Sequence, residues 1–217
     1  MPASDRRPLR TRSRPAAQSA AAWLARRGVT PNAISIAGLV VAAVAGACLL
    51  LVPGRPAGAQ AALLLAAGVL IQGRLAANML DGLVAVEGGL GTRSGPLFNE
   101  VPDRFADLLI LVPAGYAIVW ADWGPELGWA AGVLAVLTAY VRLLGGSLGQ
   151  QQRFSGPMAK PHRMFVLTLA CLVSAIEALA FHFEGAALTA GLAVIVVGSA
   201  LTFCSRLGHV AAALDGP

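Results

Sequence analysis

The sequence predicts an all-α, polytopic membrane protein with six transmembrane helices, preceded by an amphipathic juxtamembrane helix. Of its 217 residues, 57% are hydrophobic and only 12% are charged, which is too apolar for an ordinary soluble domain. Six apolar runs reach the length of about 20 residues that a spanning helix needs. The basic residues do not form a stripe with interleaved aromatic side chains, so the sequence gives no indication of nucleic-acid binding.

The amino-terminal region carries seven of the sixteen basic residues ahead of the first apolar run. Residues 1–15 are rich in Pro, Arg and Ser, and we expect a disordered cytoplasmic tail there. Residues 16–28 predict a short amphipathic helix in the membrane interface, with Trp23 as an anchor and Gly28 as its end. The pair Thr30-Pro31 then supplies an N-cap and a first-turn proline for the next helix.

The six apolar runs predict spanning helices that leave no room for a separate soluble domain. Their approximate bounds are 32–52, 59–78, 98–120, 127–146, 163–182 and 186–205. We therefore expect one six-helix domain over 29–207 and a cytoplasmic tail over 208–217. Basic residues gather on one side of this topology, which by the positive-inside rule places both termini and the two long loops in the cytoplasm. The predicted location is the inner (plasma) membrane.

One polar stretch, residues 78–107, interrupts the apolar sequence and holds five of its eleven acidic side chains. Asn78 and Asp81 are three residues apart, and Asn99 and Asp103 are four apart, so each pair shares one face of a helix. If the second spanning helix ends near Asp81 and the third begins near Asn99, both faces lie at one membrane level. Carboxylates at such a level are costly unless a cation or a water-filled cavity receives them.

The polar stretch therefore predicts a site for a divalent cation. The predicted metal ligands are Asn78, Asp81, Asn99, Glu100, Asp103 and Asp107. Because no Cys or His joins these oxygen donors, Mg²⁺ or Mn²⁺ is favoured over zinc. The alternative is that nearby basic residues, Arg74 and Arg104, neutralise the carboxylates in salt bridges.

Two motifs in this stretch stand at a distinctive spacing: Asn78-x-x-Asp81-Gly82-x-x-Ala85-Val86, and Gly95-x-x-x-Asn99-x-x-x-Asp103. They resemble the pattern D-x-x-D-G-x-x-A-R followed by G-x-x-x-D-x-x-x-D of the CDP-alcohol phosphotransferase family. The start of the first spanning helix and the region from Tyr140 to Arg163 are also similar to this family. The variant with asparagines resembles a divergent bacterial branch.

The resemblance implies a metal-dependent transfer reaction on the cytoplasmic side of the membrane. A phosphatidyl group would pass from a CDP-linked lipid, usually CDP-diacylglycerol, to a small alcohol acceptor with release of CMP, in phospholipid biosynthesis. By the resemblance, Asp103 matches the catalytic base and Asp81 a metal ligand. Gly82, Ala85 and Gly95 match positions close to the nucleotide. The resemblance also suggests a homodimer.

Basic residues at the cytoplasmic helix ends, Arg142, Lys160 and Arg163, are candidates for binding the phosphate of an acceptor. The alternative for them is only the charge asymmetry of the topology.

Three departures from the family pattern bear on function. Asn78 and Asn99 replace aspartates and Val86 replaces an arginine. An asparagine still offers a neutral oxygen, but the lost charge should lower metal affinity unless other acids, such as Glu100 and Asp107, compensate. Two further hypotheses are a small transporter with an acidic cytoplasmic cavity and a catalytically inactive, lipid-binding member of the family. A transporter predicts polar residues along the whole depth of several helices, whereas here they cluster at one end.

Overall fold

The computed structural model describes residues 15–152, 154 and 156–215, and over these the chain forms seven α-helices and no strand. The predicted all-α class is confirmed. Apart from Pro15, the tail predicted over residues 1–15 lies outside the described residues, as do residues 216–217 of the predicted carboxyl-terminal tail.

The first two helices begin and end as the sequence signals indicated. Helix α1 (Pro15–Arg26) corresponds to the predicted juxtamembrane helix, and the chain turns after it at Gly28, whose φ of 73° only glycine adopts easily. Helix α2 (Pro31–Leu50) begins after Thr30, whose side chain accepts a backbone N–H of the first turn. This N-cap satisfies one of the donors that a helix start leaves unpaired.

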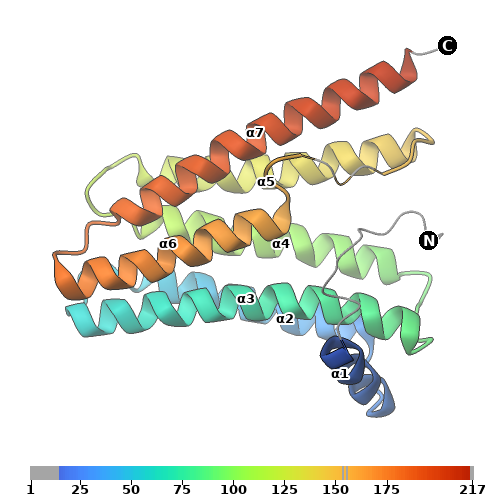
Figure 1. Cartoon of the computed structure of the whole chain (residues 1–217), viewed down its shortest axis with the longest axis horizontal. Helices are drawn as coiled ribbons and strands as arrows, with labels where there is room; N and C mark the ends of the chain where they lie inside the picture. Colours follow the sequence, from blue (N-terminus) through green and yellow to red (C-terminus); the bar gives the residue numbers. More distant parts are fainter. Residues whose placement is uncertain (1–14, 153, 155, 216–217) are drawn as a thin grey trace.

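The remaining helices form a bundle of long, roughly antiparallel elements (Figure 1). They are α3 (Ala57–Glu87), α4 (Gly95–Tyr116), α5 (Gly124–Ser147), α6 (Lys160–Ala180) and α7 (Ala186–Leu214). Helix α2 packs against α3 and α4, α3 against α6, α4 against α5, and α7 against α5 and α6. Helix α1 packs on the carboxyl-terminal half of α3 and projects from the bundle at the right-hand end of Figure 1.

Helix α3 is longer than the sequence predicted. The second span was expected to end near residue 78, with a loop over 79–97, but the helix continues to Glu87 and ends at the Gly88-Gly89 pair. The reason is that 79–87 contains good helix formers, with a single glycine, which a helix tolerates at a cost of about 1 kcal/mol. Helix α7 likewise runs beyond its predicted end near residue 205.

Five helices, α2, α3, α5, α6 and α7, are long and apolar enough to cross a membrane. Helix α4 is long enough but carries four charged residues, Glu100, Asp103, Arg104 and Asp107, so a sixth span stays a prediction. Large apolar side chains cover the outside of the bundle, and Val69, Phe165 and Leu179 are all more than 60% exposed. Such an exterior is what a lipid environment requires.

Helices α2 and α4 approach each other very closely at Gly46. Pro113 has no N–H, so the carbonyl of Leu109, one turn earlier, lacks its helical donor and faces Gly46 instead. A Cβ added at Gly46 would lie only 2.0 Å from that carbonyl oxygen. Glycine is thus required for this packing, which sets the distance between the helices that carry Ser35 and Asp103.

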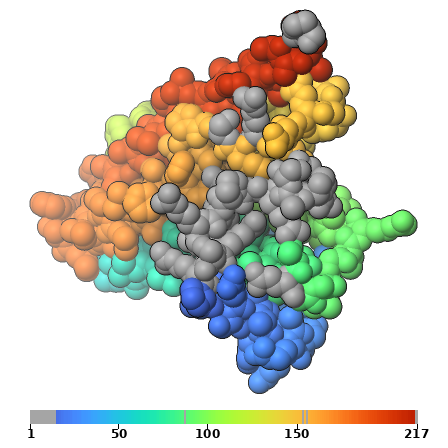
Figure 2. All heavy atoms as spheres, turned by 45° about the vertical axis from the view of Figure 1, so that its right-hand side comes forward, coloured from blue at the N-terminus to red at the C-terminus, as the bar shows by residue number. Residues whose placement is uncertain are grey.

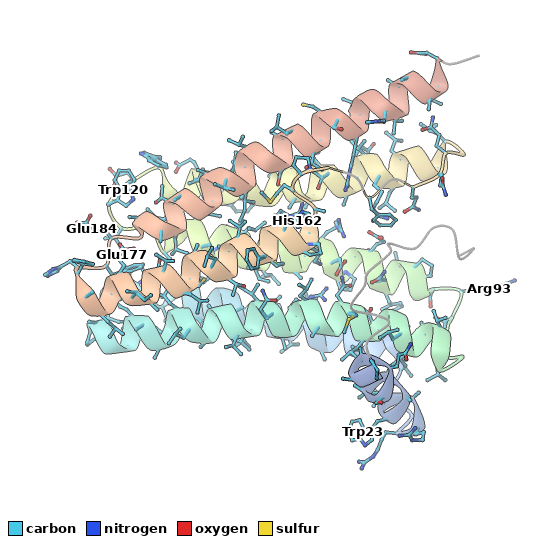
Figure 3. The ribbon with its side chains drawn as sticks, viewed as in Figure 1. Trp23, Arg93, Trp120, His162, Glu177 and Glu184 are labelled. Atoms are coloured by element: carbon cyan, nitrogen blue, oxygen red, sulfur yellow. The ribbon has the colours of Figure 1, made fainter. Side chains whose placement is uncertain are left out.

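The end of the bundle opposite α1 is held by Glu177, a half-buried acid in the last turn of α6. Its Oε1 accepts N–H groups of Glu184, Gly185 and Ala186 at 3.0–3.3 Å, and Oε2 accepts that of Ala187 at 3.5 Å. Figure 3 shows Glu177 and Glu184 together at this end, far from Arg93 at the other. A carboxylate here satisfies the unpaired donors at the start of α7 and complements its dipole.

Candidate functional site

A cavity of about 960 Å³ opens at the end of the bundle where α3, α5 and α7 finish and α2, α4 and α6 begin. Figure 2 looks toward this end: α1 and α7 lie at opposite edges, with the ends of α3 and α4 in green and of α5 in yellow between them. All seven helices contribute lining residues, so the cavity forms only when the whole bundle is assembled.

The cavity gathers nearly all the residues that the sequence singled out. Those lining it are Asn78, Asp81, Gly82, Ala85, Gly95, Asn99, Glu100, Asp103, Arg142, Lys160 and Arg163. Asp107 is the exception, since it is fully buried one turn deeper on α4. The expected juxtaposition of the two motif faces, at the end of α3 and the start of α4, is therefore present.

The charge of the cavity wall is predominantly positive. Its basic residues are Arg93, Arg104, Arg142, Lys160, Arg163 and Arg206, and its acidic residues are Asp81, Glu100 and Asp103. A cavity with twice as many basic as acidic side chains favours an anionic ligand, such as one that carries phosphate groups.

Asp81 lies near the end of α3 and is 4% exposed. Ser35 of α2 donates its hydroxyl to Asp81 Oδ2 at 2.7 Å. This neutral hydrogen bond orients the carboxylate without cancelling its charge. Asp81 and Asp103 line the same cavity, and two carboxylates in one cavity repel each other unless a shared cation stabilises them.

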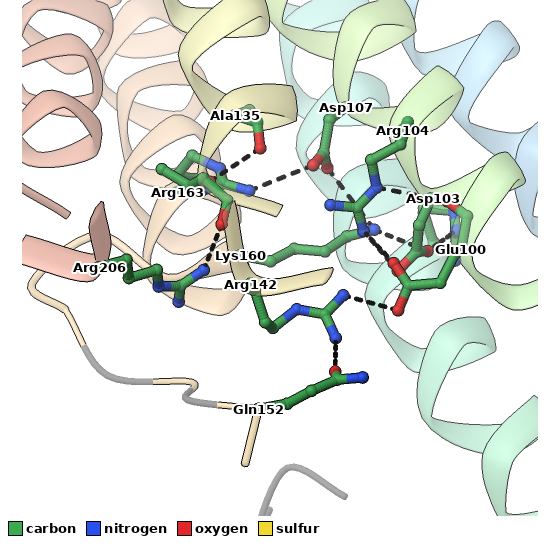
Figure 4. A network of polar contacts seen from close by, with 12 residues as sticks. Glu100, Asp103, Arg104, Asp107, Ala135, Arg142, Gln152, Lys160, Arg163 and Arg206 are labelled. Carbon is green, nitrogen blue, oxygen red and sulfur yellow. Dashed lines mark hydrogen bonds and ion pairs between the residues drawn. The ribbon is translucent and has the colours of Figure 1, made fainter. Parts of the chain in front are cut away.

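Asp103, the predicted base, is held by cations on two sides. Arg74 of α3 forms an ion pair with Asp103 Oδ1, and Lys160 of α6 contacts the same oxygen at 2.8 Å (Figure 4). Arg104 approaches Oδ2 at 3.5 Å. The salt bridges that the sequence left as an alternative are therefore formed, although Asp103 still lines the cavity.

Asp107 is buried deeper in the bundle than the residues that line the cavity. Arg163 of α6 contacts Asp107 Oδ2 at 3.2 Å, and its guanidinium also donates to the carbonyl of Met158 and to Thr138. Lys160 lies 3.5 Å from Asp107 Oδ1. The Asp107 carboxylate thus faces two cations rather than the cavity, and in this arrangement it supports the basic residues.

Glu100 and Arg142 form the rim on the other side. Arg142 of α5 donates to Glu100 Oε1 at 2.6 Å and also to Gln152 Oε1, and its guanidinium stacks on the ring of Phe154. Figure 4 shows this pair beside the Lys160 and Asp103 contact. Arg142 is thereby fixed at the mouth of the cavity by the connection between α5 and α6.

A divalent cation fits the oxygen donors at the cavity wall if a ligand supplies the rest of its shell. No group of three or more His, Cys, Asp or Glu side chains among the described residues is arranged to hold a metal ion. However, Mg²⁺ is commonly bound through one or two carboxylates together with substrate phosphates and water. Asp81 and Asp103, with the amides of Asn78 and Asn99 on the same wall, match that kind of site.

Several residues of the site were not assigned a place in it from the sequence. Ser35 lies on α2, 46 residues before Asp81 in the sequence, so no local pattern predicts their contact. Arg206 of α7 donates to the carbonyl of Thr138 at 2.7 Å and lines the cavity. A lone arginine in an apolar helix is a detectable signal, since such a charge nearly always faces a polar interior.

Comparison with known proteins identifies relatives of this fold. No family model matches the chain. The inner membrane protein YnbA of Escherichia coli strain K12 is 29% identical over 158 residues, which are 71% of this chain and 72% of that protein. That relative's description gives its location and no chemistry.

Solved structures of a Mycobacterium tuberculosis phosphatidylinositol phosphate synthase, PgsA1, are similar over most of the chain. Its complex with manganese and citrate has a TM-score of 0.71 and 25% identity, covering 89% of this chain and 88% of that one. Its complex with CDP-DAG has a TM-score of 0.70 and 26% identity, covering 89% and 92%. The structural neighbours are thus CDP-alcohol phosphatidyltransferases, and the resemblance that the motif spacing indicated is confirmed.

Proposed function

We propose that this chain, whose structural neighbours are CDP-alcohol phosphatidyltransferases, transfers a phosphatidyl group from a CDP-linked lipid to a small alcohol and releases CMP. CDP-diacylglycerol is the proposed donor, as the related synthase has been solved with CDP-DAG. The observation that carries the proposal is the cavity, where Asp81 and Asp103 share a wall with a surplus of basic side chains. Its volume of about 960 Å³ lies within the range of small-molecule sites.

The reaction forms a bond between the acceptor oxygen and the lipid-side phosphorus and breaks the bond from that phosphorus to CMP. Asp103 takes the proton of the attacking hydroxyl, and Lys160 stabilises negative charge on the phosphoryl oxygens. Mg²⁺ or Mn²⁺, held by Asp81 and Asp103 with the amides of Asn78 and Asn99, would neutralise the diphosphate when bound. Phosphoryl transfer depends mainly on such positioning and charge neutralisation.

The two substrates would occupy different parts of the cavity. The nucleotide is assigned to the side formed by Gly82, Ala85 and Gly95, where small residues let a ligand approach the backbone. The acceptor is assigned to the side of Arg142 and Arg163, whose guanidinium groups suit a phosphate. An acceptor that itself carries a phosphate, such as a sugar phosphate or glycerol phosphate, is therefore the class that this cavity favours.

The distribution of buried charge favours an enzyme over a transporter. Every buried charged side chain that the structure describes lies at the cavity end, and the deeper polar residues, such as Ser174 and Ser199, are neutral. A transport path would need polar groups along the bundle. We propose that the cavity and both termini face the cytoplasm of the inner membrane and that the protein is a homodimer, for which its native mass in detergent is the test.

The proposal is tested by measuring CMP release from CDP-diacylglycerol by the purified protein in mixed micelles. A panel of polyols, sugar phosphates and amino alcohols supplies the acceptor, and each reaction is run with Mn²⁺, with Mg²⁺ and with EDTA. We expect release with at least one acceptor, dependence on the metal, and loss of about 100-fold or more in Asp103→Asn, since a proton acceptor contributes roughly 10²–10⁴-fold.

The matched control is Asp122→Asn, the same change at an exposed position on the opposite end of the bundle. It should leave CMP release unchanged. Absence of release with every acceptor, or release that Asp103→Asn does not reduce, contradicts the proposed reaction and favours the non-catalytic, lipid-binding alternative.

A further inference from the structure

One oxygen of the Asp103 carboxylate, Oδ1, is engaged by two cations that differ in how firmly each is held, while Arg104 approaches the other oxygen, Oδ2, at 3.5 Å. Arg74 and Lys160 both contact Asp103 Oδ1, from α3 and from α6. A carboxylate oxygen that already has two cationic partners has little attraction left for a third. A divalent cation that binds between Asp81 and the Oδ1 atom of Asp103 must therefore compete with one of these two side chains.

Arg74 is the fixed partner. It is 1% exposed, does not line the cavity and lies against α2, where a Cβ on Gly38 would come within 3.2 Å of its Cδ and Nη1 atoms. Withdrawal of Arg74 from Asp103 would leave a buried charge without a counter-ion, which is strongly destabilising. Arg74 therefore stays in place whatever the cavity contains.

Lys160 is the partner that can leave. It lines the cavity, and its buried Nζ has charge contacts at 2.8 and 3.5 Å to Asp103 and Asp107 but no hydrogen bond of regular geometry. It is also the first residue of α6, where the helix dipole favours anions over cations. A lysine is a compact charge on a flexible stem, so its ammonium can move into the cavity without disturbing the helix.

We infer that the Lys160 ammonium pairs with Asp103 when no divalent cation is bound and moves away from Asp103 when that cation binds. Arg74 stays paired with Asp103 in both states. An anion in the cavity draws the Lys160 ammonium away from Asp103 and so exposes the carboxylate. Anion binding and metal binding then strengthen each other, because by linkage each ligand raises the affinity of the other by the same factor. The inference rests on the cation site of the proposed function, but not on any acceptor.

The test measures binding rather than turnover. Free Mn²⁺ is measured by electron paramagnetic resonance in titrations of the purified protein in detergent, with and without sulfate as an anion probe. Lys160→Gln should bind Mn²⁺ about tenfold more tightly than the unchanged protein when sulfate is absent, within the usual range of coupling between sites. Sulfate should tighten Mn²⁺ binding to the unchanged protein and have no such effect on Lys160→Gln.

Two control variants separate the possible causes. Arg93→Gln removes one positive charge from the cavity lining at an exposed position, and it should change Mn²⁺ affinity far less than Lys160→Gln does. Lys160→Met, which keeps the length of the stem, should behave like Lys160→Gln. Asp103→Asn, titrated only as protein that elutes in size-exclusion chromatography like the unchanged protein, should abolish the tight Mn²⁺ site in every background.

The outcomes distinguish this inference from the proposed function. If Mn²⁺ binds in an Asp103-dependent manner but equally in Lys160→Gln and the unchanged protein, the displacement is refuted and the cation site stands. Equal tightening by Arg93→Gln and Lys160→Gln also refutes it, since general charge would then explain both. If Asp103→Asn binds Mn²⁺ as well as the unchanged protein does, the cation site itself is refuted.

Discussion

The close contact of α2 with α4 at Gly46 predicts that one added methyl group will disturb the site from a distance. In Gly46→Ala, the new Cβ would lie 2.0 Å from the Leu109 carbonyl oxygen and 3.1 Å from Cγ of Pro113. Contacts of a Cβ below 3.0 Å essentially do not occur, and the obstacle here is backbone, which cannot rotate away. The two helices must therefore separate by roughly 1 Å or more, an overpacking that costs about 1–3 kcal/mol.

Part of this cost is offset because alanine favours a helix over glycine by about 0.5–1 kcal/mol. The net loss should lower the apparent melting temperature in detergent, at about 2–4 °C per kcal/mol for a chain of this size. The separation also shifts Ser35 on α2 relative to Asp103 on α4. Because misplacement by about 1 Å can cost up to 100-fold in rate, CMP release should fall more than stability alone would explain.

The control is Gly58→Ala on α3, where an added Cβ meets no atom within 4 Å. It should melt at or slightly above the temperature of the unchanged protein and keep its activity. Both variants are followed by fluorescence-detected size-exclusion chromatography after heating. A Gly46→Ala protein that melts and turns over like Gly58→Ala would refute the packing argument.

Further predictions concern the two ends of the bundle. Glu177→Gln should lower the apparent melting temperature, since a charged acceptor at the start of α7 contributes about 1–3 kcal/mol. Glu184→Gln, at an exposed neighbouring position, should leave the melting temperature unchanged. Equal melting curves for the two variants would argue against the capping role of Glu177. Asn99→Asp should raise Mn²⁺ affinity in the absence of substrate because it restores a carboxylate to the cavity wall, and an unchanged titration would remove Asn99 from the predicted ligand set. Ser35→Ala removes the hydroxyl that orients Asp81 and should lower the turnover of CMP release about tenfold with little change in donor KM. A hydrogen bond to a charged group contributes about 1.5–3 kcal/mol. Full activity in this variant would show that the contact is dispensable.

Local spacing predicted the helices and the two motif faces well. The i, i+3 and i, i+4 spacing of Asn78 with Asp81 and of Asn99 with Asp103 is a property of each helix alone, and short connections force neighbouring helices to be antiparallel. The cavity accordingly contains these residues. The observed end of α3 differs from the predicted one because the glycines and acidic residues over 79–97 indicate a loop, whereas most residues of 79–87 favour a helix.

The partners of the carboxylates depend on which helices meet, and periodicity does not contain that information. Arg74 lies one helical turn before Asn78, so the sequence predicts that both residues share a face of the helix. Its contact with Asp103 depends on how α4 packs against α3, which the sequence pattern does not specify. The contact of Ser35 with Asp81 likewise required α2 to pack on α3. The role of Glu177 is likewise not predictable from the pattern of its own helix, since its four backbone partners all belong to the following connection and helix.

The length of α3 bears on where the cavity lies relative to the bilayer. Its 31 residues extend about 46 Å at 1.5 Å per residue, whereas the hydrocarbon core of a bilayer is about 30 Å thick. A helix that starts at one face of that core leaves it after about 20 residues, close to Asn78. With this placement the cavity wall from Asn78 onward would lie at the level of the lipid headgroups, where the two-chain donor of the proposed function would present its diphosphate while both acyl chains stay in the membrane.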